Sequence, residues 1–165
     1  MGLSASKRVS KTLENSPEFN AACDSAYDDC LNLTQHAFPG VKPYQLLPAS
    51  TRLYIAVSTS VPLISRWAPS PPTQSQVDRA LESVNIDGGE TLILTREQFK
   101  AFAVELFKDV IVSNARGAVL RRVPVGIVGI AGLGMATRSS RDVVGKAMGV
   151  YALGVAAAVY LSLSF

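Results

Sequence analysis

The sequence predicts a mostly α-helical protein: a small helical domain in the cytosol, followed by a Gly/Ala-rich C-terminal membrane helix or helical hairpin. Three observations predict this class. Hydrophobic residues make up 48 % of the 165 residues and charged residues only 18 %, fewer than the roughly 25 % of an ordinary soluble domain. Apolar residues recur at helical spacing through much of 16–114. Residues 147–165 carry no charge.

Basic and acidic residues are distributed unequally along the chain. Residues 1–109 carry ten basic and twelve acidic residues, whereas residues 110–165 carry six basic residues and one acidic residue. A nucleic-acid-binding face would combine a basic stripe with aromatic residues. Here the basic residues flank long apolar runs instead, as at the cytosolic end of a membrane segment. We therefore expect a membrane as a partner and no nucleic acid.

Residues 1–15 are predicted to be a flexible N-terminus that carries a fatty acid. Gly2 follows the initial methionine, and a serine stands four positions after it, which is the pattern of N-myristoylation. One myristoyl chain binds membranes only marginally, so a second signal is normally needed. Lys7, Arg8 and Lys11 supply a basic patch beside this end. The sequence thus predicts lipidation at Gly2 and a domain that faces the cytosol.

The first helix of the domain, residues 16–33, is predicted from its start signal. Ser16 is a typical N-cap, and Pro17 suits the first helical position. A proline–glycine pair at 39–40 closes the segment. Residues 50–66 form a second apolar stretch, for which a helix is favoured over a strand.

Cys23 and Cys30 are predicted to be buried free thiols. Seven residues apart on one helix, their Cα atoms would lie about 10 Å apart, too far for a disulfide. Little in the sequence supports palmitoylation or a redox pair. His36 is the only histidine, and a capping role at the helix end is favoured over catalysis.

Residues 74–113 are predicted to form a helix–loop–helix unit. Helical spacing indicates a helix over 74–84, and the loop that follows begins at Asp87. Leu94 ends a short apolar run that could form a strand, and Thr95 is a plausible N-cap for a long helix. This order of elements resembles the EF-hand superfamily, and the overall layout is similar to small plant proteins grouped with EF-hand proteins.

The resemblance implies a loop in which positions 1, 3, 5 and 12 present oxygen ligands to calcium. With Asp87 first, Thr91 stands at position 5, Leu94 at the apolar position 8 and Gln98 at position 12. Asp87, Thr91 and Gln98 are therefore the candidate calcium ligands. Gly89 at position 3 brings no side-chain oxygen, a leucine replaces the turn glycine at position 6, and Gln98 replaces the bidentate glutamate. We expect calcium to bind weakly or not at all.

The helix after this loop is predicted to bind a protein partner. Phe99, Phe102 and Leu106 stand on one stripe of the helix. We expect them to line a groove between helices into which the partner, whose identity the sequence does not give, would dock.

Residues 115–165 are predicted to associate with a membrane through the segments 123–137 and 147–165. The second segment reaches about 28 Å as a helix, close to the roughly 30 Å of a hydrocarbon core. A single crossing by this segment keeps every basic residue in the cytosol and is slightly preferred over two crossings. Small residues would let helices pack closely, in the hairpin or in a homo-oligomer; they are Gly129, Gly132, Gly145 and Gly149.

No enzymatic activity is expected, and no cofactor other than the candidate calcium ion. Residues 125–136 resemble a dinucleotide-binding fingerprint, but the strand–helix–strand context and the later acidic residue are missing. The sequence contains no GxSxG, Walker A or CxxC motif. The leading hypothesis is a membrane-tethered EF-hand-like interaction or scaffold module. A true calcium sensor and a structural or accessory subunit of a membrane complex are the alternatives.

Overall fold

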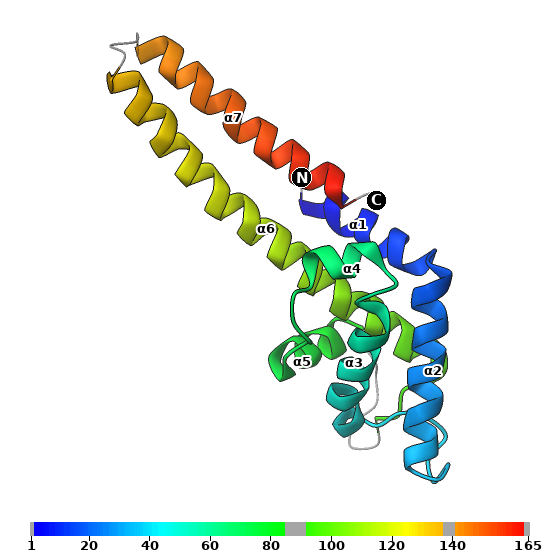
Figure 1. Cartoon of the computed structure of the whole chain (residues 1–165). Helices are drawn as coiled ribbons and strands as arrows, with labels where there is room; N and C mark the ends of the chain where they lie inside the picture. The colour runs from blue at the N-terminus through cyan, green and yellow to red at the C-terminus, as the bar shows by residue number, and fades with distance from the viewer. Residues whose placement is uncertain (1, 85–91, 137–140, 164–165) are drawn as a thin grey trace. The chain divides into compact units, whose positions relative to one another are not determined.

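The computed structural model describes the backbone of residues 2–84, 92–136 and 141–163. In this part of the chain the protein is mostly helical, as predicted. The chain divides into two compact units, 1–112 and 113–165, so the division falls two residues before the predicted boundary. The helices are drawn in Figure 1: α1 (Gly2–Glu14), α2 (Pro17–Leu33), α3 (Pro43–Val57), α4 (Pro62–Trp67), α5 (Gln74–Ser83), α6 (Arg96–Ala136) and α7 (Arg141–Ser162).

The helix α1 corrects the prediction of a flexible N-terminus. Val9 and Leu13 are fully buried, and they stand four residues apart, the spacing of one helix face. Lys7 and Lys11 are exposed. The segment is therefore an amphipathic helix of the first unit, with basic residues on the side that faces water.

The helix α2 begins where the sequence predicts and ends at Leu33, before the proline–glycine pair at 39–40. The Oγ atom of Ser16 accepts a hydrogen bond from the Phe19 backbone N–H at 3.2 Å, and Pro17 takes the first helical position. At the other end, Gln35 and His36 adopt φ values of 50° and 57°, in the left-handed region where helices commonly terminate. The His36 N–H donates back to a helix carbonyl at 2.9 Å. His36 thus lies in the helix-ending turn.

The two cysteines of α2 are buried free thiols, as predicted. Burial raises the pKa of Cys23 to about 12. Burial also raises the pKa of Cys30. Both thiols therefore stay protonated at neutral pH, and neither is an activated nucleophile.

The apolar stretch 50–66 belongs to two helices. α3 and α4 begin at Pro43 and Pro62, and each proline occupies the first helical position. The start of α3 was not predicted, because its N-cap residue, Lys42, is not of a type that commonly caps helices.

The elements α5 and α6 match the predicted helices of the 74–113 unit. Thr95 and Gln98 form a reciprocal capping box: the Thr95 N–H donates to Gln98 Oε1 at 2.9 Å, and the Gln98 N–H donates to Thr95 Oγ1 at 3.3 Å. α6 then continues through Pro124 to Ala136. The predicted segment 123–137 is thus, up to Ala136, the end of the helix that starts in the first unit.

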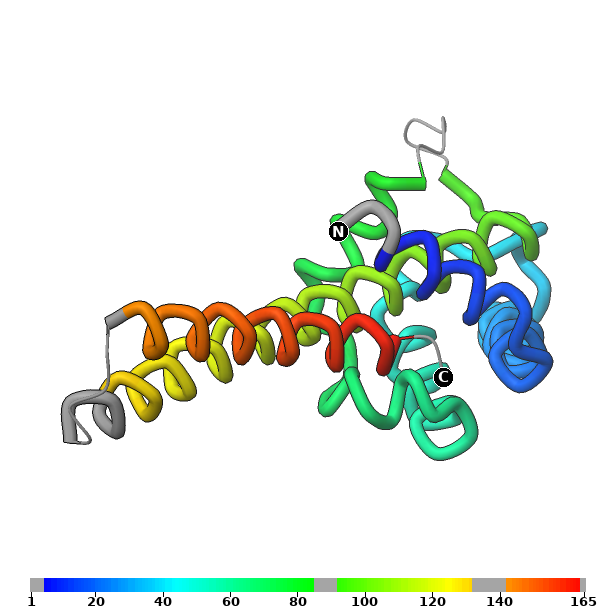
Figure 2. Tube along the Cα trace, turned by 90° about the horizontal axis from the view of Figure 1, so that it is seen from above, coloured from blue at the N-terminus to red at the C-terminus, as the bar shows by residue number. Residues whose placement is uncertain are grey.

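Aromatic rings from α2 and α6 build the core of the first unit. Phe19 lies edge-on to Phe107 with ring centroids 5.8 Å apart. The Phe99 ring centroid lies 5.9 Å from that of Tyr27 and 6.1 Å from that of Phe102. Such pairs contribute about 0.5–1.5 kcal/mol each beyond the area they bury. These contacts join α2 to the start of α6, while α3 runs beside α2 (Figures 1 and 2).

In the second unit, the end of α6 and α7 form an antiparallel helix pair (Figures 1 and 2). The Tyr151 hydroxyl donates to the Arg122 carbonyl oxygen at 3.3 Å. A Cβ atom at Gly126 would lie 1.9 Å from the Tyr151 ring, so a larger residue there would have to displace this ring. Gly126 therefore lies where the Tyr151 side chain of α7 contacts α6.

Three of the four predicted packing glycines have no close neighbour among the described residues. A Cβ atom at Gly129, Gly145 or Gly149 would meet nothing within 4 Å among the described residues. Gly132 lies in α6, and its surroundings are outside the described part. A role for these glycines between copies of the chain stays a prediction.

Candidate functional site

The loops that precede α3 and α6 pair through one antiparallel bridge. The Val41 N–H donates to the Leu94 carbonyl at 3.0 Å, and the Leu94 N–H donates to the Val41 carbonyl at 2.8 Å. Both side chains are fully buried. A Cβ atom at Gly40 would lie 2.3 Å from the Leu94 oxygen, so this crossing requires glycine.

A glutamine stands at the same distance in the sequence after each of the two bridge residues. Gln45 and Gln98 each stand four residues after the bridge residue of their loop, at the third position of the next helix. The Gln45 Oε1 atom accepts the Lys42 N–H at 3.0 Å, as Gln98 accepts the Thr95 N–H. Gln45 is also buried, and its Nε2 donates to the Cys30 carbonyl at 3.0 Å. The chain therefore holds two matching helix–loop–helix segments, α2–α3 and α5–α6.

Sequence reasoning found the second of these segments and missed the first. The signal was present: Val41 before a proline-started helix, with a glutamine four residues later, repeats the spacing of Leu94 and Gln98. The α2–α3 segment was missed because its loop shares no other chemically distinctive residues with the α5–α6 loop.

Of the candidate calcium ligands, Asp87 and Thr91 lie outside the described residues. The Gln98 side chain is engaged in the capping box of α6. No group of three His, Cys, Asp or Glu residues that could hold a metal occurs in the described part of the chain. The described geometry therefore offers a neutral amide, and no carboxylate, at loop position 12.

The predicted partner-binding residues lie in the core, which corrects the prediction of an open groove. Phe99 and Leu106 are 0 % exposed and Phe102 is 1 % exposed. An amphipathic stripe has the same sequence pattern whether it faces a groove or the protein's own core. Here the Tyr27 ring of α2 packs against Phe99, the first residue of the stripe. A partner cannot reach these side chains in this structure.

In the described part of the first unit, the large apolar side chains that are exposed lie on α2 and α3. Leu33 and Tyr44 are 63 % and 67 % exposed. They line a cavity of about 200 Å³ between the two helices, with Arg52 among the other lining residues. This cavity, rather than the Phe99 stripe, presents apolar surface to solvent.

Charged side chains fasten the start of α6 to α2. Arg96 pairs with Asp24 at 3.1 Å and with Asp28 at 2.5 Å, and Lys100 pairs with Asp24 at 2.9 Å. The hydrogen bond from Lys100, followed by that from Arg96, lowers the pKa of Asp24. Because the folded pKa lies below the unfolded one, this cluster stabilises the fold at neutral pH and loses that effect as the pH falls through the acid range.

One described helix is long and apolar enough to cross a membrane. It comprises Asp142–Ser162 in α7, and only 6 % of its most apolar stretch is buried. At 1.5 Å per residue it reaches about 30 Å, the thickness of a hydrocarbon core. Length and composition thus agree with the predicted C-terminal membrane segment.

Comparison of the chain with family models, with curated proteins and with solved structures gives no match. The functional argument therefore depends on the geometry of the two units alone.

Proposed function

We propose that the chain is a membrane-tethered EF-hand-like interaction or scaffold module in which calcium binding is weak or absent. The observation that carries the proposal is the bridge between Val41 and Leu94. Leu94 is the residue that the EF-hand resemblance places at the apolar position 8, and Val41 stands at the matching point of the other helix–loop–helix segment. Two such segments, paired through their loops, support an EF-hand-like unit better than one isolated segment does.

The tether in this proposal is α7. Its exposed apolar surface favours a lipid environment, because large exposed apolar surfaces are rare on soluble monomers. We infer a single crossing, with the first unit in the cytosol. Acylation of Gly2 would add a second attachment at the start of α1.

Weak calcium binding follows from the residues at the ligand positions. A bidentate glutamate at position 12 normally supplies two of the oxygen ligands. Gln98 has one uncharged oxygen, and that atom already accepts the Thr95 N–H. Of the ligand positions 1, 3, 5 and 12, only position 1 therefore brings a carboxylate in the wild-type loop, that of Asp87.

A calcium titration with a gain-of-function variant tests this proposal. We expect the full chain in an uncharged detergent to show no saturable amide NMR shifts up to millimolar calcium. The variant Gly89→Asp/Leu92→Gly/Gln98→Glu restores the missing ligands and the turn glycine. It should bind calcium with a dissociation constant on the order of 10 µM, within the range of sensor loops.

The same triple variant with Asp87→Ala is the matched control, because it lacks the ligand at position 1. It should bind calcium far more weakly than the triple variant. Saturation of the wild-type chain at micromolar calcium would instead support the true calcium sensor. A folded triple variant that binds no calcium would contradict the EF-hand-like loop.

A structural or accessory subunit of a membrane complex is the second candidate function. The observation that favours it is the open face of α7, where Gly145 and Gly149 would admit a neighbouring helix. If this function is correct, Gly145→Leu/Gly149→Leu should shift the complex on native gels to the mass of the free chain. Val150→Leu, an exposed apolar change on the same helix, is the control and should leave migration unchanged. Unchanged migration of the glycine variant would contradict the subunit function.

A further inference from the structure

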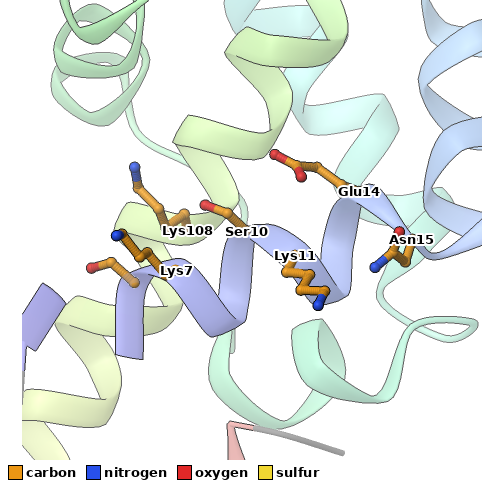
Figure 3. A pocket seen from close by; sticks show the side chains of 7 residues that line it. Lys7, Ser10, Lys11, Glu14, Asn15 and Lys108 are labelled. Carbon is orange, nitrogen blue, oxygen red and sulfur yellow. The ribbon is translucent and has the colours of Figure 1, made fainter. Parts of the chain in front are cut away.

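The basic side of α1 forms a cationic surface together with one residue of α6. Lys7, Lys11 and Lys108 line one cavity of about 630 Å³, and Ser6 and Ser10 also belong to its lining. Figure 3 shows that this cavity is built along α1, with Lys108 contributed by the neighbouring helix. We call these five residues the lysine surface.

The lysine surface combines two lysines that lie outside the described ion pairs with hydroxyl groups. Among the described residues, neither Lys7 nor Lys11 is in an ion pair. Lys108 contacts the Glu105 carboxylate, and Glu14 is the acidic residue in the lining. Lysine ammonium groups bind phosphate as point charges, and serine hydroxyls can donate to phosphate oxygens. The surface therefore suits an oxyanion better than an apolar or cationic ligand.

We propose that the lysine surface binds the headgroups of anionic membrane lipids. The inference deepens the proposed function, because it rests on a chain that is tethered to a membrane. One expectation and one observation favour a lipid surface as the source of the oxyanions. α1 starts at Gly2, so an acyl chain on that residue would hold this same helix at a bilayer. Val9 and Leu13 are buried on the opposite side of α1, so the cationic side stays available.

The expected effect of lipid charge on each lysine is about fivefold. A Lys or Arg near an anionic leaflet gains roughly 1 kcal/mol, which converts to that factor. The attraction depends on salt, because the screening length falls from about 10 Å at 0.1 M to about 3 Å at 1 M. The effect of lipid charge and the effect of salt can both be measured at single lysines.

Lysine acylation in lipid nanodiscs tests the inference. The full chain is placed in discs of phosphatidylcholine alone or with phosphatidylserine, and the acylation rate of each lysine is read by mass spectrometry. We expect Lys7 and Lys11 to react about fivefold more slowly in the phosphatidylserine discs, and the difference to vanish in 1 M salt. Lys42, at the start of α3, is the internal control and should react at the same rate in both discs.

The outcomes separate this inference from the proposed function. A chain that enters neither disc would contradict the membrane tether as well as the lysine surface. Entry into both discs with equal rates at Lys7 and Lys11 would leave the tether standing and overturn the inference. Inositol hexakisphosphate added to the neutral discs distinguishes a free phosphate: if it alone slows these lysines, the ligand is soluble and the lipid assignment is wrong. The variant Lys7→Gln should restore faster acylation of Lys11 in anionic discs.

Discussion

Replacing Phe102 with alanine is expected to destabilise the first unit strongly rather than to weaken the binding of a partner. The side chain is 1 % exposed, and its ring lies 6.1 Å from that of Phe99. Truncation of a buried phenylalanine costs about 3–5 kcal/mol. Whole domains are stable by only about 5–15 kcal/mol. Denaturant unfolding of the full chain in an uncharged detergent, followed by near-ultraviolet circular dichroism, should show a much lower midpoint.

Tyr44→Ala is the matched control for this experiment, since it removes an aromatic ring that is 67 % exposed in the same unit. Surface changes of this kind usually alter stability by no more than about 0.5 kcal/mol. The midpoint of this variant should therefore stay close to that of the wild type. If Phe102→Ala kept the wild-type midpoint but lost a protein partner, the residue would line a groove after all.

Features set by neighbouring residues were predictable from the sequence. Ser16 and Thr95 cap α2 and α6 because a hydroxyl bonds to an N–H three residues further on. The uncharged run at the C-terminus identified α7 through its length and composition alone. The buried side of α1 was equally local, since Val9 and Leu13 stand four residues apart. It was missed because the basic residues around them, Lys7, Arg8 and Lys11, suggested a solvated tail.

Features set by long-range contacts were not predictable. The stripe that begins at Phe99 is equally consistent with a groove and with a core, until Tyr27 of α2 is known to cover it. Gly126 and Gly129 look alike in the sequence, yet only Gly126 lies under the Tyr151 ring. The pairing of Val41 with Leu94 joins segments far apart in the chain, and only the shared spacing to Gln45 and Gln98 relates the two loops in the sequence.

Two arginines in the middle of α7 are expected to abolish membrane integration. Val150 and Leu153 are 71 % and 73 % exposed, and both lie near the centre of Asp142–Ser162. A charged residue at the centre of a spanning helix costs about 2.5–3.5 kcal/mol on insertion scales. The insertion cost of two arginines would exceed the free energy that a short span gains by burying its apolar side chains in lipid. We expect wild-type chain in the pellet after carbonate extraction of membranes, and Val150→Arg/Leu153→Arg chain in the supernatant.

A variant with an arginine near the end of α7, rather than at its centre, is the control for this result. Val143→Arg introduces the same residue near the end of the helix, where the side chain can extend to the headgroups, so this variant should remain in the pellet. Because Val150 and Leu153 are exposed, the first unit should unfold at the same denaturant concentration in all variants. If carbonate extracted the wild-type chain, α7 would not be a membrane anchor. If the double-arginine variant stayed in the pellet with its fold intact, the attachment would have to come from another part, and an acylated Gly2 on α1 would be the first to test.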